Sequence, residues 1–245
     1  MPRDRVAASL THAAYERLRA DLLACRLRPG ERLRINDLCA ALSVSLSAVR
    51  EALSRLTAEG LVVAEPQRGF RVAPISAAEL KDLTATRITI ETLCLRRAIA
   101  AGDVGWEERL VAAHHRLART PERAEGDARR VSEAAAEAHA AFHRALVAGC
   151  DSPWLLRLRE LLYAQSERYR RLSVPLARAE RDLAREHREL MEAALSRDSD
   201  RAARLIADHL SLTSAILLEA QDTAEENAGW WTQRTDGEDR AGDGR

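Results

Sequence analysis

One stretch of forty residues, from Leu33 to Val72, limits the possible folds of this chain more than any other. It opens with apolar residues at the spacing of a short helix. These are Ile35, Leu38, Ala41 and Leu42. Asn36 or Asp37 is placed to start this helix, and the segment 43–45 interrupts it.

A second helix follows, with an apolar stripe and a polar outward face. The stripe consists of Val49, Leu53 and Leu56. Ser45 or Ser47 can cap this helix, because a serine oxygen accepts hydrogen bonds from the N–H groups of a first turn. Gly60 is placed to end it. The outward face offers two short donors and one long side chain that can read a base edge, namely Ser45, Ser47 and Arg50.

Two short strands are predicted next, at 61–63 and 70–72, with Pro66, Arg68 and Gly69 in the turn between them. Helix, turn, helix and a hairpin with a basic tip make up a winged helix-turn-helix. In that motif the second helix enters the major groove of DNA. The alternative is two packed helices and a hairpin that bind no partner.

Residues 18–72 also resemble the DNA-binding domain of the GntR-type bacterial transcription regulators. The matching segments are Arg28-Pro29-Gly30-Glu31-Arg32-Leu33, Leu38-Cys39-Ala40-Ala41-Leu42-Ser43-Val44-Ser45, Val49-Arg50-Glu51-Ala52-Leu53, Leu56, Glu59-Gly60-Leu61 and Arg68-Gly69. The family usually has Ser-Arg-Thr-Pro where this chain has Ser45-Leu46-Ser47-Ala48. Leu46 therefore either contacts a thymine methyl group or leaves recognition to Arg50 and the wing. The resemblance implies DNA contacts from Arg34, Ser45, Leu46, Ser47, Arg50, Arg68 and Gly69.

The charge distribution fits nucleic acid binding at the N-terminal end. The 245 residues have no formal net charge, but residues 1–72 hold twelve arginines against eight acidic residues. The remainder is acidic by the same margin. The four cysteines are scattered, which favours buried apolar side chains in a reducing compartment over disulfides or a zinc site. Neither a signal peptide nor a transmembrane run of ~20 apolar residues is visible, so we expect a cytoplasmic protein without a membrane partner.

Outside this stretch the chain shows only helical patterns. One amphipathic helix is predicted at 10–24, after frayed residues 1–8. Pro74 marks a linker, and Ser76-Ala77-Ala78-Glu79 forms a capping box, a typical helix start. Further helices are predicted at 76–101, 104–118, 127–148, 153–172, 177–196 and 199–221. Their short connections indicate an antiparallel bundle.

The predicted fold is therefore mainly α, in two domains. Residues 1–73 form a winged helix-turn-helix of three helices with a small β-hairpin wing. Residues 74–222 form an all-α antiparallel helical bundle. Residues 223–245 have little to bury and are expected to be a disordered tail, although Trp230-Trp231 is unusual there.

Histidines carry the chemistry of the second domain. His139 and His143 are four residues apart, so they project from the same face of one helix. His187 and His209 lie on later predicted helices. If these helices converge, four imidazoles can bind Zn, Ni, Co, Cu or Fe. Two histidines at this spacing are, however, more often solvated or core side chains than metal ligands.

Residues 76–220 resemble the helical effector domain, called FCD, of one large GntR subgroup. The matches are Arg87-x-x-x-Glu91, Phe142-His143-x-x-Leu146, Glu186-His187 and His209-Leu210. In that family an acidic residue and three histidines hold a divalent metal, which implies roles for His143, His187 and His209, with His139 at the acid's position. Since this exchange removes one negative charge, the site should favour Zn or Ni over Mn.

The resemblance also implies a function. In the FCD subgroup the metal and an arginine, here Arg87, bind small organic acids, and homodimers bind operator DNA, most often as repressors. Arg87 can equally pair with Glu91 on its own helix, and both roles can hold at once. Two alternatives stay open: a metal-dependent enzyme, or a DNA-binding protein with a structural metal and no effector. No acidic residue is placed as a general base by any motif we recognise, which counts against the enzyme.

Overall fold

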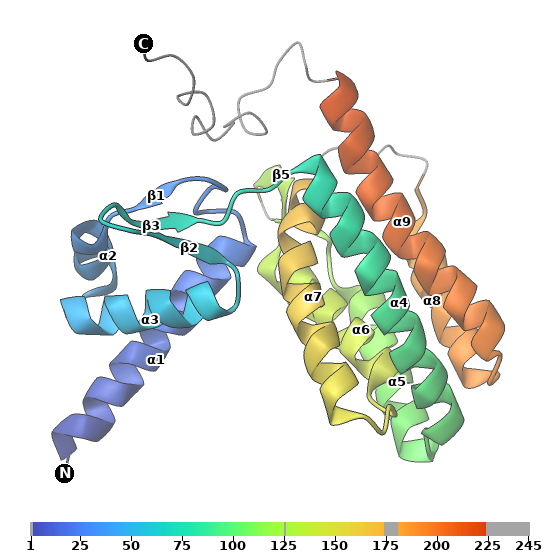
Figure 1. Cartoon of the computed structure of the whole chain (residues 1–245). Helices are drawn as coiled ribbons and strands as arrows, with labels where there is room; N and C mark the ends of the chain where they lie inside the picture. The colour runs from blue at the N-terminus through green and yellow to red at the C-terminus, as the bar shows by residue number, and fades with distance from the viewer. Residues whose placement is uncertain (1, 125, 174–180, 224–245) are drawn as a thin grey trace, which may run out of the picture.

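The computed structural model describes residues 2–124, 126–173 and 181–223. A winged domain and a helical bundle lie side by side in it (Figure 1). The winged domain contains α1 (Pro2–Leu23), β1 (Arg32–Leu33), α2 (Ile35–Leu42), α3 (Leu46–Ala58), β2 (Val62–Glu65) and β3 (Gly69–Val72). The bundle contains α4 (Ala77–Ala101), α5 (Val104–Arg119), β4 (Arg123–Ala124), β5 (Asp127–Val131), α6 (Glu133–Val147), α7 (Pro153–Ser173), α8 (Leu183–Leu195) and α9 (Ser199–Thr223).

The winged domain is built around the apolar stripe of α3. Val49, Leu53 and Leu56 are fully buried, as predicted, and pack against α1 and the wing. The wing is a three-stranded antiparallel sheet in the order β1-β3-β2, whereas two strands were predicted. The short β1 completes it because Arg32 and Leu33 pair with the outer edge of β3.

Local capping explains the turn between α2 and α3. Ser43 adopts a left-handed conformation (φ 54°) that ends α2. The Ser45 hydroxyl then accepts a hydrogen bond from the Ala48 N–H at 3.3 Å, so Ser45 rather than Ser47 caps α3. Gly60 follows α3 with φ 73°, as a residue that ends a helix in the left-handed region should. The prediction for α2 was wrong, since its N-cap is Arg34 and not Asn36 or Asp37.

Two other predictions for the winged domain were also wrong. The first helix extends back to Pro2 instead of fraying over residues 1–8. On its predicted apolar face, Ala14, Leu18 and Leu22 are buried, but Leu10 is 48% exposed. Figure 1 shows α1 beside α3 in the winged domain.

The bundle follows the predicted helix order with two corrections. Residues 127–131, predicted as the start of a helix, form strand β5, which pairs with β4 in a hairpin. Gly126, with φ 78°, allows the tight turn, and Ser132 caps α6 by accepting from the Ala135 N–H at 3.0 Å. The second domain is therefore not purely helical. In addition, α8 begins only after its N-cap Asp182, because the Asp182 carboxylate accepts the Arg185 N–H.

Helix α7 joins the two domains. Its Gln165 side chain donates to the Glu59 carbonyl at the end of α3, and its Arg168 side chain donates to the Ala73 carbonyl of the linker. The Tyr169 hydroxyl donates to Glu79, so Glu79 of the capping box contacts α7 instead of closing the box on Ser76. The contacts of Gln165 and Arg168 thus tie α7 to the end of α3 and to the linker, whereas that of Tyr169 lies within the bundle.

None of the helices in the described residues combines the length and hydrophobicity that crossing a bilayer requires. All four cysteines are free thiols; Cys94 and Cys150 are buried, whereas Cys25 and Cys39 are only partly so. The tail was predicted at 223–245, but Thr223 is the last residue of α9. The rest of it, including Trp230-Trp231, lies outside the described residues.

Candidate functional site

The residues predicted to contact DNA all lie on the surface of the winged domain. Each of the seven is solvent-exposed, although they come from the α2 cap, the first turns of α3 and the wing: Arg34, Ser45, Leu46, Ser47, Arg50, Arg68 and Gly69. Leu46, at 45% exposure, is a large apolar side chain left in water at the start of α3. These positions agree with the predicted interface, and contact with DNA stays a prediction.

The wing tip is shaped by two residues with positive φ angles, Gln67 (61°) and Gly69 (93°). A guanidinium N–H of Arg32 donates to the Arg68 carbonyl at 2.9 Å and ties β1 to this tip. The Arg68 side chain is therefore presented outward from a turn that is held at its backbone. Such a cation is suited to the DNA backbone or minor groove beside the helix.

In the bundle, three helices bring the four predicted histidines together. His139 and His143 come from α6, His187 from α8 and His209 from α9. Each residue offers a ring nitrogen, and these nitrogens all lie within 4.8 Å of one another. Ring centroids are 4.5 Å apart for His139 and His143 and 4.9 Å apart for His187 and His209. The face of α6 that carries His139 and His143 thus points into the bundle and is not solvated.

The burial of this cluster favours neutral imidazoles. Burial, together with the neighbouring cations, lowers the pKa values of His139, His143 and His187 well below the usual value. Both ring nitrogens of His143 and Nε2 of His187 have no hydrogen-bond partner among the described residues. Because buried polar atoms rarely go unsatisfied, and because a neutral imidazole is the ligand form, the residues present fit a metal ion.

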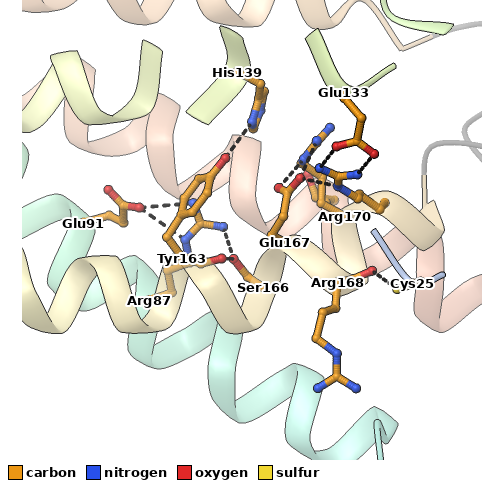
Figure 2. Close-up of polar contacts among 12 residues, drawn as sticks. Cys25, Arg87, Glu91, Glu133, His139, Tyr163, Ser166, Glu167, Arg168 and Arg170 are labelled. Atoms are coloured by element: carbon orange, nitrogen blue, oxygen red, sulfur yellow. Dashed lines mark hydrogen bonds and ion pairs between the residues drawn. The ribbon is translucent and has the colours of Figure 1, made fainter. Parts of the chain in front are cut away.

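Two further side chains orient the histidines, and the sequence had not pointed to either role. Glu186 accepts a hydrogen bond from His209 Nδ1 at 2.7 Å. The Tyr163 hydroxyl lies 3.2 Å from His139 Nδ1 (Figure 2). Burial opposes ionisation of Glu186, but hydrogen bonds from Arg181 and His209 outweigh it and lower the pKa of Glu186 to about 2. This carboxylate supplies negative charge next to the cluster, from α8 and not from the position of His139.

A cavity of about 370 Å³ opens beside the cluster. His139, His187 and His209 line it, together with residues of the β4–β5 hairpin, α8 and α9. Its basic lining includes Arg170 of α7 and Arg181, the residue before the α8 N-cap. Neither arginine had been singled out from the sequence, because no local pattern distinguishes them from the many surface arginines.

Arg87, the arginine predicted from the sequence, lies elsewhere. It lines a smaller cavity of about 30 Å³, which also touches His139 and His209. Its guanidinium donates to Glu91 Oε1 at 3.1 Å and to Ser166 Oγ at 2.7 Å (Figure 2). The predicted pairing with Glu91 is thus present, and the carboxylate-binding role stays a prediction.

Comparison with known proteins finds a matching family for each domain. Residues 10–72 match the bacterial regulatory proteins of the gntR family, and residues 82–212 match the FCD domain. The HTH-type transcriptional regulator BphR of Paraburkholderia xenovorans is 41% identical over 85% of this chain and 85% of its own length. The HTH-type transcriptional repressor GlaR of Escherichia coli is 35% identical over 84% and 94%. The crystal structure of a GntR transcriptional regulator from Rhodococcus sp. RHA1, at 25% identity, superposes with a TM-score of 0.69 over 86% of this chain and 99% of its own.

Proposed function

Because this chain belongs to the GntR family of bacterial transcription regulators and carries the FCD domain, we propose that it is a repressor controlled by a small organic acid. It is a DNA-binding regulator and not an enzyme. The observation that carries the proposal is the cluster of four buried histidines, open to a cavity that arginines line. An acid bound there would change the affinity of the winged domain for its operator.

His139, His143, His187 and His209 would hold a divalent transition metal, of which Zn and Ni suit four neutral imidazoles best. When bound, the metal supplies positive charge that attracts a carboxylate or a chelating hydroxy acid. The protein supplies the remaining recognition. Arg170, Arg181 or Arg87 can each pair with a carboxylate, and the cavity volume of about 370 Å³ suits a small organic acid.

Operator recognition would follow the arrangement of the winged domain. A homodimer presents two copies of α3 to a pseudo-palindromic site, whose half-site separation reflects the dimer geometry. Exposed leucines on the neighbouring helices α4 and α7 supply apolar surface for a second copy: Leu93, Leu158 and Leu161. Ser45, Ser47 and Arg50 would contact bases or phosphates, and Arg68 with Gly69 would bring the wing to the DNA backbone.

Arg50→Ala should weaken specific DNA binding by about 1–3 kcal/mol, because a bidentate arginine contributes roughly that much to base discrimination. The operator is first selected from a random DNA pool with the unchanged protein, and both proteins are then titrated against it. Arg204→Ala, with the same charge change on an exposed part of α9, is the matched control. Equal binding by the Arg50 variant would remove this residue from the recognition set.

The effector is tested by titrating the metal-loaded protein on this operator against small carboxylates, including malate, which can chelate at one end and pair with an arginine at the other. At least one acid should lower operator affinity by about 5-fold or more, as a coupling free energy above 1 kcal/mol would produce. Calorimetry on Arg87→Gln, Arg170→Gln and Arg181→Gln should then show about a 10-fold loss of acid affinity wherever an arginine contacts the acid.

Unchanged operator affinity with every acid would favour the alternative of a structural metal without an effector. Consumption of the acid during the titration would favour the alternative of a metal-dependent enzyme. Nuclear magnetic resonance of the recovered acid detects such consumption. These two results are distinguishable, because only the second changes the acid itself.

A further inference from the structure

A continuous row of ion pairs leads from the effector cavity to the winged domain. It runs from Arg170 through Glu167, Arg171 and Glu133 to Arg26. Arg170 lines the cavity beside the histidines, and Arg26 lies just after α1 in the winged domain. We name these five residues the relay.

The cavity end of the relay is a buried carboxylate shared by two arginines (Figure 2). Glu167 accepts from Arg170 Nε at 2.7 Å and from Arg170 NH2 at 2.8 Å. It also accepts from Arg171 Nε at 2.9 Å. Burial opposes ionisation of Glu167, but the two arginines outweigh it and lower the pKa of this group. The two arginines therefore favour the charged form of Glu167 despite its burial.

The other end of the relay crosses between the domains. Arg171 donates two parallel hydrogen bonds to Glu133, from NH1 at 3.0 Å and from NH2 at 3.1 Å. Glu133 Oε1 also accepts from Arg26 NH1 at 2.8 Å. The Glu133 side chain is 56% exposed, so it is the fork from Arg171 that holds its carboxylate in place for Arg26.

The relay lies between two cavities. Arg170 lines the cavity of about 370 Å³ next to the histidines. Glu167, Arg171 and Glu133 line a second cavity, of about 210 Å³, whose opposite wall is α1. The Arg170–Glu167 pair thus lies between the proposed effector and the interface with the winged domain.

We propose that a carboxylate paired with Arg170 in the effector cavity is sensed by the winged domain through Glu167, Arg171 and Glu133. This inference rests on the proposed function for its ligand, but the relay itself belongs to the fold. An incoming carboxylate competes with Glu167 for the guanidinium of Arg170. Glu167 then attracts the guanidinium of Arg171 more strongly. The NH1 and NH2 groups of Arg171 are engaged with Glu133, so this shift pulls them away from Glu133. When the fork on Glu133 opens, that exposed side chain becomes mobile and its contact with Arg26 weakens.

The relay can be tested without acid or operator by replacing the first cation. Arg170→Gln removes one of the two arginines that hold Glu167, as competition by a carboxylate would. Hydrogen–deuterium exchange of the full-length protein should be about two- to fivefold faster in residues 18–27, which a loss of one exposed ion pair would cause. Glu133→Gln should have the same effect, and the double variant should exchange no faster than either single variant.

Glu137→Gln is the matched control for Glu133. It lies one turn further along α6, is 73% exposed and pairs with Arg144 of its own helix. It should leave hydrogen–deuterium exchange in residues 18–27 unchanged. Combined with Arg170→Gln, it should give the same exchange rate as Arg170→Gln alone. Arg170→Lys, which keeps the charge, should restore most of the protection.

Independent effects of Arg170→Gln and Glu133→Gln would overturn the relay, as would normal exchange in 18–27 for either variant. If Arg170→Gln also speeds exchange across the bundle core, Arg171→Gln takes its place in the same comparison, because it leaves the Arg170–Glu167 pair intact. Failure of the acid titrations with intact coupling here would reject the proposed effector and not the relay.

Discussion

Substituting both His143 and His187 with alanine is expected to abolish metal binding. These residues come from different helices and hold the buried ring nitrogens that have no partner among the described residues. Full-length protein without a histidine tag should contain about one zinc or nickel ion per chain, as a single site of four ligands implies. The double variant should contain almost none, and elemental mass spectrometry measures both.

The same substitution should remove the stabilisation that metal confers. A ligand present at a hundred times its dissociation constant stabilises the native state by about 2.7 kcal/mol. The melting temperature of the unchanged protein should therefore rise with added zinc and fall with a chelator, and that of the double variant should do neither. His115→Ala, an exposed histidine on α5, is the control and should bind metal normally.

If the unchanged protein stays free of metal even after soaking, the exchange of an acidic ligand for His139 has abolished metal binding. Recognition of the acid would then depend on the arginines and hydrogen bonds of the cavity alone. In that case the three arginine substitutions should show larger effects on acid binding, because no metal shares the carboxylate.

Replacing Glu91 with alanine is expected to destabilise the protein by about 3–5 kcal/mol, because it leaves buried charge without its partner. Glu91 is almost fully buried and accepts hydrogen bonds from Arg159 and Arg87. The Arg159 side chain is itself only 1% exposed, so water cannot replace the lost carboxylate. Urea denaturation followed by circular dichroism gives the free energy of unfolding of both proteins.

Glu160→Ala provides the matched control on the same arginine. Glu160 accepts from Arg159 NH1 at 3.1 Å, but its side chain is 47% exposed. Its loss should cost less than about 1 kcal/mol, as is usual for an exposed ion pair. Equal effects of the two substitutions would show that water reaches Arg159 and that burial does not set the cost.

Glu91 also bears on the predicted role of Arg87. An acid that uses Arg87 must share this guanidinium with Glu91, which already holds it at 3.1 Å. Glu167 likewise holds Arg170, but Glu167 belongs to the relay, which reaches the winged domain. Comparing the arginine substitutions therefore separates a residue that binds the acid from one that also transmits binding.

Several parts of this protein were determined by the sequence itself. The stripe of Val49, Leu53 and Leu56, the cap Ser45 and the helix end Gly60 lie where local spacing predicted them. The pairing of His139 with His143 on one helix face also follows from a spacing of four residues. These features involve neighbours within one or two turns of a helix, so short-range patterns specify them.

Other parts were decided only by the tertiary structure. Residues 127–131, predicted as the start of a helix, pair with β4 as strand β5, and α6 begins only after the cap Ser132. Glu186, Tyr163 and Arg170 gained their positions from packing between α6, α7, α8 and α9. The partners of Glu186 and Tyr163 lie 23 and 24 residues away in the chain. An arginine or glutamate on a helix has the same local signature whether it faces water or a cavity. Burial and long-range pairing, which no short-range pattern records, therefore determined which charged residues surround the histidines.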